Sequence, residues 1–272
     1  MTGRSDILRI EAVERDAWLD LYAAAPRALR DRLGISHRRA DDGALLICRG
    51  VDHLQFNRLG YLRLDQPARA ETVDAAIAEF DAAGVKNWIV HVAKGADALA
   101  DICAARGLTP HPRTWAKFVR DNRPAPAVAT SLSIGEAGAD RALAFGATAA
   151  AGFGMPPVMG DWLAALPGRP HWRCFAAYDG DTPVGAGALY VDGGCGWLGI
   201  GATLASQRGR GAQSALLAVR INAAIAAGCA LLTTETGIPQ AGDAAPSYGN
   251  IQRAGFAIAY PRPNLRRAPA AE

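Results

Sequence analysis

The stretch at 196–227 constrains the fold more than any other part of the chain, because it predicts a strand, a turn and a helix in direct succession. Residues 196–204 form an apolar run with glycines, which is typical of a buried strand that a backbone or a ligand approaches closely. Residues 211–227 are rich in Ala, Leu and Ile and predict a helix. The turn between them, Arg208-Gly209-Arg210-Gly211, holds two arginines and two glycines.

This turn has the composition of an anion site. A strand that turns through glycine into a helix leaves unpaired N–H groups at the helix N-terminus, and these donors and the helix dipole favour phosphate. Gly209 and Gly211 let the backbone approach such a group, and Arg208 and Arg210 add charge. A Walker loop is excluded, because no Gly-Lys is followed by Ser or Thr. A dinucleotide fingerprint fits poorly, but Glu235 lies near its expected acidic position, so a nucleotide-dependent oxidoreductase stays an open alternative.

Composition limits the function classes. The 272 residues suffice for one large domain or two ordinary ones, and half of them are apolar. A net charge of +3 is too small to indicate nucleic-acid binding. The five cysteines and five histidines lack metal-ligand spacing, so we expect buried thiols and no metal. Without a signal core or an apolar run of membrane length, the sequence predicts a cytoplasmic protein with no membrane partner.

The order of predicted elements divides the chain in two. Residues 121–127 have linker composition, so we predict domains at 1–123 and 130–272, the latter ending in a solvated basic tail, Arg262, Arg266 and Arg267. In the first half, strands are predicted at 7–13, 44–48, 59–64, 88–92 and 115–119, and helices at 16–33, 70–83 and 97–106. In the second half, strands are predicted at 132–134, 172–178, 183–191, 196–204, 229–234 and 256–260, and helices at 140–150, 158–166, 211–227 and 247–254.

The two halves repeat each other. In each, a helix ends at a glycine (Gly84 or Gly228), a strand follows, and the next helix ends at Gly107 or Gly255. A gapless alignment places Arg208, Gly209 and Gly211 on Leu64, Asp65 and Pro67. Because an aspartate repels phosphate and a proline lacks a donor, the first half is predicted not to bind phosphate there, and to serve structure or to wall a substrate cleft.

The turn also resembles a known loop. Residues 208–213 are similar to the acyl-CoA pyrophosphate loop of the GNAT superfamily of N-acyltransferases, whose pattern is Gln/Arg-x-x-Gly-x-Gly/Ala. Arg208 and Gly211 match its first two fixed positions, and Gln213 stands where Gly or Ala is usual. The predicted element order over 172–260 resembles the GNAT core. The resemblance implies an α/β fold of two GNAT-like domains in tandem, each a mixed, mostly antiparallel sheet flanked by helices, with a degenerate N-terminal domain.

The resemblance further implies acetyl-CoA as the acyl donor. It points to the backbone of Ala202, Thr203 and Leu204 for the pantetheine arm, and Asn250 resembles the asparagine that contacts CoA in the superfamily. The pyrophosphate would lie on a continuous run of residues, namely Arg208, Gly209, Arg210, Gly211, Ala212, Gln213 and Ser214.

Catalysis would need a base for the amine and an acid for the thiolate. Glu235, at the end of the strand beside the loop strand, is the candidate base, and a solvated strand-end glutamate is the equal alternative. Its pKa would need burial or a water relay to rise from about 4. Many GNAT enzymes carry a tyrosine acid four residues before the Gly of Gly255-Phe256, where this chain has Ile251. Tyr248 is the candidate acid, with a tyrosine packed on the sheet as its alternative.

These features together predict an N-acetyltransferase. It would move an acetyl group from acetyl-CoA to a primary amine of a small molecule, amino acid or peptide, by direct attack in a ternary complex. The acceptor class follows from the superfamily alone, and a homodimer is compatible with it. The missing tyrosine favours an alternative, a non-catalytic acyl-CoA-binding sensor or scaffold module, and turnover with an amine would distinguish the two.

Overall fold

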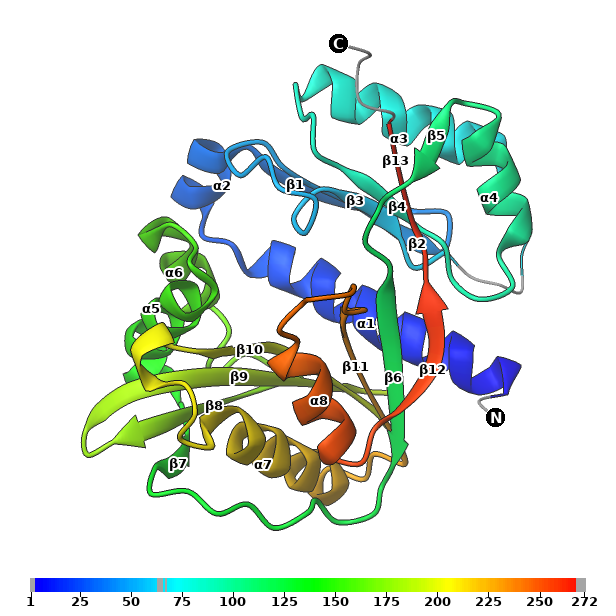
Figure 1. The fold of residues 1–272 in the computed structure, drawn as a ribbon. Helices are drawn as coiled ribbons and strands as arrows, with labels where there is room; N and C mark the ends of the chain where they lie inside the picture. Colours follow the sequence, from blue (N-terminus) through cyan, green and yellow to red (C-terminus); the bar gives the residue numbers. More distant parts are fainter. Residues whose placement is uncertain (1–2, 63–65, 67, 268–272) are drawn as a thin grey trace. The chain divides into compact units, whose positions relative to one another are not determined.

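The computed structural model describes residues 3–62, 66 and 68–267 of the chain (Figure 1). The chain splits into two compact units, the first unit (Met1–Ala116 and Tyr260–Glu272) and the second unit (Lys117–Ala259). It passes from the first to the second inside strand β6 (Trp115–Asp121) and returns inside β12 (Ala257–Arg262). Among the described residues, no helix is both long and apolar enough to cross a bilayer.

The first unit is a mixed sheet with helices. Its sheet has the order β1-β2-β3-β4-β13-β5, in which β3 and β4 are parallel and the other pairs antiparallel. Its strands are β1 (Ile35–Ala40), β2 (Gly43–Cys48), β3 (Arg58–Gly60), β4 (Ile89–His91), β5 (Leu108–Pro110) and β13 (Asn264–Arg267). Its helices are α1 (Arg4–Ala24), α2 (Arg27–Leu33), α3 (Ala70–Ala82) and α4 (Asp97–Ala104).

One core of the first unit lies between the sheet and two helices. Val73 and Phe80 of α3 and Leu99 of α4 pack on Leu59 and Val90 of the central strands. α1 packs on β1 and β2. The predicted helices at 70–83 and 97–106 are therefore confirmed, as are the strands at 44–48 and 88–92.

The strand predicted at 7–13 is wrong, because these residues form part of α1. Ile7, Ile10 and Val13 are buried at spacings of three residues, which is one face of a helix and not of a strand. The helix predicted at 16–33 is divided at Pro26, since α1 ends at Ala24 and α2 begins at Arg27. The strand predicted at 59–64 is observed as β3 (Arg58–Gly60), and residues 63–65 lie outside the described part.

The second unit follows its prediction closely. Its seven-stranded sheet has the order β12-β6-β11-β10-β9-β8-β7. The strands not yet given are β7 (Ser133–Glu136), β8 (Trp172–Asp179), β9 (Thr182–Asp192), β10 (Cys195–Thr203) and β11 (Leu231–Gly237). The helices are α5 (Ala142–Phe153), α6 (Pro157–Leu163), α7 (Ala212–Ala226) and α8 (Pro246–Arg253), with short 3-10 turns at Ala139–Arg141 and Ala205–Gln207.

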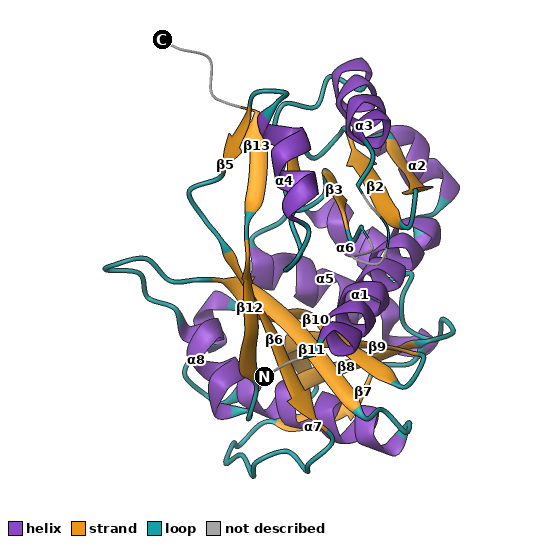
Figure 2. Cartoon of the chain, turned by 90° about the vertical axis from the view of Figure 1, so that its right-hand side faces the viewer, coloured by secondary structure: helices purple, strands orange, loops and turns teal. Residues whose placement is uncertain are grey.

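Helices cover both faces of this sheet. A Cβ at Gly201 would lie 3.4 Å from Nη2 of Arg220 in α7, whereas the Cβ of Ala202 would lie 2.8 Å from a Cβ at Gly152 in α5. Because neighbouring residues of a strand point to opposite faces, α5 and α7 lie on opposite sides of β10. α8 packs beside α7 (Figures 1 and 2).

The end of the chain differs from its prediction. β13 joins the first sheet between β4 and β5, and β6 joins the second sheet between β12 and β11. The domain predicted at 130–272 therefore extends past the second unit, because residues from Tyr260 onward group with the first. The predicted solvated tail is wrong for Arg262, which is 0% exposed and ion-paired with Glu11 and Glu14. Arg267 is also paired, with Asp81.

Candidate functional site

The centre of the second unit's sheet opens between two parallel strands. β10 and β11 pair only from Cys195–Leu231 to Trp197–Thr233, although β10 continues to Thr203 and β11 to Gly237. The register of β10 with β9 shifts between Gly199 and Ala202, which marks a β-bulge. Beyond these pairs, β10 and β11 are not paired with each other at their carboxyl ends, where open sheets bind ligands.

The loop after β10 leads directly into the N-terminus of α7. Gly209 and Gly211 have φ of +81° and +84°, a conformation that glycine adopts without a steric penalty. Gly211 is the N-cap of α7, and its carbonyl accepts a bond of 3.0 Å from the amide of Ala215. The amides of Ala212, Gln213 and Ser214 precede that bond, and the first turn holds no acidic residue. A helix N-terminus of this kind favours an anion, and the anion site stays a prediction.

The two loop arginines are not equivalent. Arg210 donates to Asp179 Oδ2 at 2.6 Å and to Gln207 Oε1 at 2.5 Å, and its hydrogen bond holds the pKa of the Asp179 carboxyl below the usual range. Arg208 is exposed and has no hydrogen bond or ion pair among the described residues. Arg208 is thus available to an anion, whereas Asp179 partly neutralises Arg210.

Some of the backbone groups predicted to bind the pantetheine arm already form hydrogen bonds within the protein. The amide of Leu204 donates to Val184 O at 3.0 Å, and the carbonyl of Leu204 accepts from Gln207, so its amide is not available to a ligand. Ala202 is 4% exposed and packs on α5. The Thr203 hydroxyl is buried without a hydrogen-bond partner in the described part of the chain.

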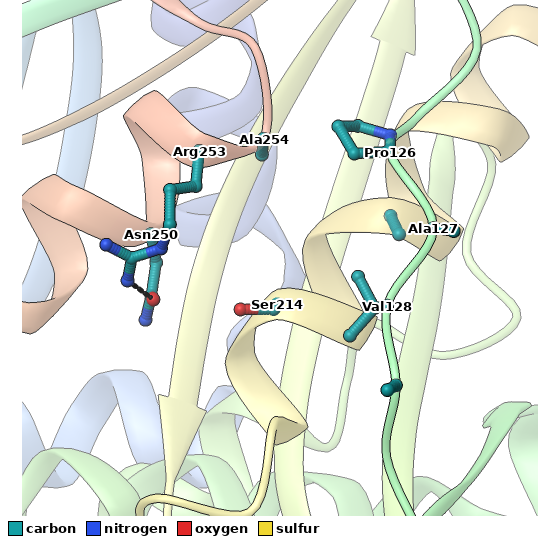
Figure 3. A pocket seen from close by; sticks show the side chains of 9 residues that line it. Pro126, Ala127, Val128, Ser214, Asn250, Arg253 and Ala254 are labelled. Carbon is teal, nitrogen blue, oxygen red and sulfur yellow. Dashed lines mark hydrogen bonds between the residues drawn. The ribbon is translucent and has the colours of Figure 1, made fainter.

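A pocket lies one turn further along α7. It has a volume of about 250 Å³. Figure 3 shows the Ser214 hydroxyl on the side of α7 that faces Asn250 and Arg253 of α8. Arg253 donates to Asn250 Oδ1 at 2.5 Å. The apolar lining comes mainly from the segment before β7, and the complete set is Pro126, Ala127, Val128, Ala129, Ser214, Ala218, Asn250, Arg253 and Ala254.

The composition of 121–127 predicts only a linker, and it indicates neither this wall nor its attachment to the loop. The Thr130 hydroxyl donates to the carbonyl of Arg210 at 2.8 Å. A Cβ at Gly211 would lie 3.1 Å from the carbonyl oxygen of Ala129. The segment is therefore held against the loop, which no local sequence signal indicates. Arg253 was also missed, although an arginine three residues after Asn250 on a helix would share its side.

The candidate acid and base lie on separate elements. Glu235 is half-buried in β11, beyond the last residue that pairs with β10. Tyr248 in α8 packs edge-to-face on Phe118, with 5.2 Å between ring centroids. Ile251, which replaces the expected tyrosine, is 4% exposed and belongs to the core. The contact with Phe118 supports the alternative that Tyr248 is a tyrosine packed on the sheet.

No metal or thiol chemistry is indicated by the described residues. They include no group of three or more His, Cys, Asp or Glu side chains placed to hold a metal ion. All five cysteines are free and buried, and burial raises the pKa of Cys48 and of Cys103 to about 11. Thiols with such pKa values carry little thiolate at neutral pH.

Comparisons by sequence found no matching family model and no matching curated protein. Comparison with solved structures found matches. A GCN5-related N-acetyltransferase from Kribbella flavida matches with a TM-score of 0.62 and 17% identity, over 90% of this chain and 95% of that one. The chain has the GNAT fold. A GCN5-related N-acetyltransferase from Sphaerobacter thermophilus matches with a TM-score of 0.57 and 17% identity, over 82% of this chain and 78% of that one.

The tandem form of the GNAT fold is also matched. A tandem GNAT protein from the clavulanic acid biosynthesis pathway has a TM-score of 0.55 and 15% identity, and the match covers 96% of each chain. The predicted fold class, two mixed sheets flanked by helices in tandem, is therefore confirmed. At such low identities the likeness concerns the fold, so activity has to be argued from the site itself.

Proposed function

We propose that the second unit binds acetyl-CoA and transfers its acetyl group to a primary amine of a small molecule, amino acid or peptide. One observation carries this proposal: β10 and β11 are not paired with each other at their carboxyl ends, and β10 leads into a glycine-capped helix N-terminus. A long ligand with an acyl thioester at one end and phosphates further along would suit both features. The mixed sheet disfavours the dinucleotide alternative, because β9 runs antiparallel to β10.

The parts of acetyl-CoA can be assigned to parts of the site. The pyrophosphate would lie on the amides of Ala212, Gln213 and Ser214, with Arg208 adding charge. The pantetheine arm would follow β10 past Thr203. The pocket between α7, α8 and the segment at 126–129 would take the adenosine end, because it combines an apolar wall with the polar tips of Asn250 and Arg253.

Glu235 is the proposed base of the transfer. The neutral amine nitrogen attacks the thioester carbonyl, the carbon–sulfur bond breaks, and the electron pair leaves on the CoA thiolate. Glu235 would take the proton released by the nitrogen, directly or through a water. Tyr248 would return a proton to the thiolate, and in its absence the solvent would do so.

Calorimetric titration with acetyl-CoA, with NAD as the control, tests the cofactor assignment. We expect acetyl-CoA to bind in the micromolar range and NAD not to bind. Binding of NAD alone would replace the proposal with the dinucleotide one. Binding of neither ligand would leave only the fold resemblance.

Thiol release over a panel of primary amines then tests the transfer. We expect Glu235→Gln to lower kcat about 100-fold or more, since a positioned base contributes roughly 10²- to 10⁴-fold. Glu136→Gln is the matched control, because Glu136 forms an exposed ion pair with Arg173 in β8. Equal loss in both variants would reject Glu235 as the base.

One observation favours a second function, acyl-CoA binding without catalysis. Ile251 is buried at the expected acid position and Tyr248 packs on Phe118, so the described α8 supplies no evident acid. This alternative predicts tight acetyl-CoA binding and no thiol release with any amine in the panel.

A further inference from the structure

Arg220 is a buried cation in the middle of the apolar helix α7. It is 1% exposed. Its Nε donates to Leu216 O at 2.8 Å, and its Nη1 donates to Gly199 O at 3.0 Å and to Ala188 O at 3.3 Å. Its Nη2 is buried without a hydrogen-bond partner, and no carboxylate contacts the guanidinium among the described residues.

The arginine is fitted to the bulge of β10. A Cβ at Gly187 would lie 2.8 Å from Cζ of Arg220, and a Cβ at Gly201 would lie 3.4 Å from Nη2. Glycine at both positions therefore makes room for the guanidinium. Between them, Ile200 has a φ of +52°, which is rare for a β-branched residue and costs about 1–2 kcal/mol. Such a conformation persists only when its surroundings fix it, and the bonds of Arg220 to Gly199 and Ala188 do so.

The bulge lies where the two parallel strands separate. Ile200 and Gly201 have no register partner in β9 or β11. Because a trans peptide is planar, the N–H of Ile200 points away from the Gly199 carbonyl, and so away from the guanidinium. A cation bonded to a peptide carbonyl polarises the peptide and strengthens its N–H as a donor.

A buried charge without a partner is costly, and this chain provides an internal reference. Arg262, 0% exposed, is matched by two carboxylates, Glu11 and Glu14. Arg220 has none, and burial lowers its pKa to about 10, so it stays protonated at neutral pH. Leaving a buried charge without an opposite charge strongly lowers the stability of a protein. The absence of a carboxylate beside Arg220 among the described residues therefore indicates that its charge serves the site.

We propose that Arg220 is a positioning residue for acyl transfer, holding the bulge and polarising the Gly199–Ile200 peptide so that the Ile200 N–H donates to the thioester carbonyl oxygen. This inference rests on the proposed function. When the amine attacks, the carbonyl π electrons move to that oxygen. The buried cation and the polarised N–H stabilise the resulting negative charge until the carbon–sulfur bond breaks and thiolate leaves.

Infrared spectroscopy of bound acetyl-CoA, labelled with ¹³C at the thioester carbonyl, tests the proposal. In the wild-type protein we expect the carbonyl stretch to lie at lower frequency than in free acetyl-CoA. Arg220→Gln should lose this shift while keeping calorimetric affinity, because the phosphate loop is untouched. Arg220→Lys keeps the positive charge but lacks the planar guanidinium with its several N–H donors, so it should retain part of the shift. Arg173→Gln, an exposed arginine of the same sheet, is the matched control and should keep all of it.

The outcomes separate the two proposals. A wild-type shift that Arg220→Gln preserves would assign Arg220 to folding alone and overturn the inference, while acetyl-CoA binding would still support the proposed function. Absence of acetyl-CoA binding in the wild type would overturn both. If Arg220→Gln does not fold, Gly187→Ala keeps the charge but crowds the guanidinium, because the new Cβ would lie 2.8 Å from Cζ and Nε and 3.2 Å from Nη1. A wild-type spectrum in that folded variant would also overturn the inference.

Discussion

The two units share a topology but treat the equivalent helix N-terminus in opposite ways. In each, a hairpin leads to a strand, a helix and a parallel strand, as β3–α3–β4 and as β10–α7–β11. α7 begins after Gly211, whose φ is positive, and its first turn holds no acid. α3 begins after Arg69, with φ of −107°, and carries Glu71 in its first turn.

The first unit places one of its own carboxylates beside the helix end. Asp41, in the β1–β2 turn, accepts a hydrogen bond from the Thr72 hydroxyl in the first turn of α3, and lies 3.5 Å from Nη1 of Arg69. In the second unit the corresponding hairpin turn supplies Asp179, which binds Arg210 but leaves the first turn of α7 alone. The comparison shows that carboxylates lie beside the helix end of the first unit, whereas the first turn of α7 holds no acidic residue.

Both units have a non-glycine residue of positive φ after the parallel pairing, Tyr61 at +60° and Ile200 at +52°. The residues that the gapless alignment pairs with Arg208, Gly209 and Gly211, namely Leu64, Asp65 and Pro67, lie outside the described part of the chain.

The largest expected effect concerns the buried charges of the first unit. Glu14→Gln removes one of the two carboxylates of Arg262 and also a hydrogen-bond acceptor of Tyr61. We expect it to lower the free energy of unfolding by about 3–5 kcal/mol, as for other broken buried pairs, in denaturant titrations followed by tryptophan fluorescence.

Glu79→Gln is the matched control for this change. Glu79 is 43% exposed and pairs with Arg38, so its loss should cost at most about 1 kcal/mol. Similar costs for the two variants would show that burial does not distinguish these pairs.

The next largest effect is expected from a substitution that gives the loop before α7 a carboxylate, as the first unit has beside α3. Gly209→Asp places a carboxylate in the phosphate loop, where φ is +81° and the new Cβ meets nothing within 4 Å. We expect acetyl-CoA to bind about 100-fold more weakly, or about 2.7 kcal/mol, by calorimetry. Gly84→Asp makes the same change at an open, left-handed glycine of the first unit and should leave affinity unchanged.

These comparisons show what local sequence can predict. The loop and its helix were predictable because two glycines, two arginines and the apolar periods lie within one stretch. The sequence did not predict that β6 joins the second sheet and β13 the first, because a strand's own pattern does not specify which sheet it joins. Arg262 looked solvated because its partners Glu11 and Glu14 lie at the other end of the chain.

The site shows the same limit. The residue types of the phosphate loop follow from sequence, but the pairing of Arg210 with Asp179 and the attachment of Thr130 depend on distant segments. Arg220 did leave a local signal. It is the single charged residue in the apolar stretch 211–227, and a lone charge in such a helix indicates a buried polar role.

His91 offers a pH test confined to the first unit. Burial, with Arg262 and Arg58, holds the pKa of His91 well below 6.5, and both its ring nitrogens lack partners in the described part of the chain. The unfolded chain takes up this proton near pH 6.5 while the folded chain does not. Protonation therefore favours unfolding, so the stability that His91 contributes is present above pH 6.5 and is lost as the pH falls.

We expect stability to fall by up to about 1.4 kcal/mol per pH unit below that point, in thermal unfolding measured from pH 7.5 to 5. His91→Phe should flatten this slope, and His111→Gln, at a half-buried position, should not. An unchanged slope in His91→Phe would assign the pH dependence to other groups.

Arg253 tests how far the second unit's ligand site extends. If the pocket takes the adenosine end of the ligand, Arg253→Ala should weaken acetyl-CoA binding about tenfold, or about 1.4 kcal/mol. The same variant should bind dephospho-CoA as the wild type does, because that ligand lacks the 3′-phosphate. Equal losses for both ligands would place the 3′-phosphate elsewhere.

The smallest effect is expected at an ion pair that has an equivalent in each unit, Arg210–Asp179 in the second and Arg69–Asp41 in the first. Asp179→Asn frees Arg210 from its carboxylate, and because the pair is 34% and 48% exposed the gain should be modest. We expect acetyl-CoA to bind about two- to fivefold more tightly at low salt, with the gain fading as salt screens it. Asp41→Asn, the equivalent change in the first unit, should leave affinity unchanged. A gain in both variants would mean that overall charge, and not the phosphate loop, determines the affinity.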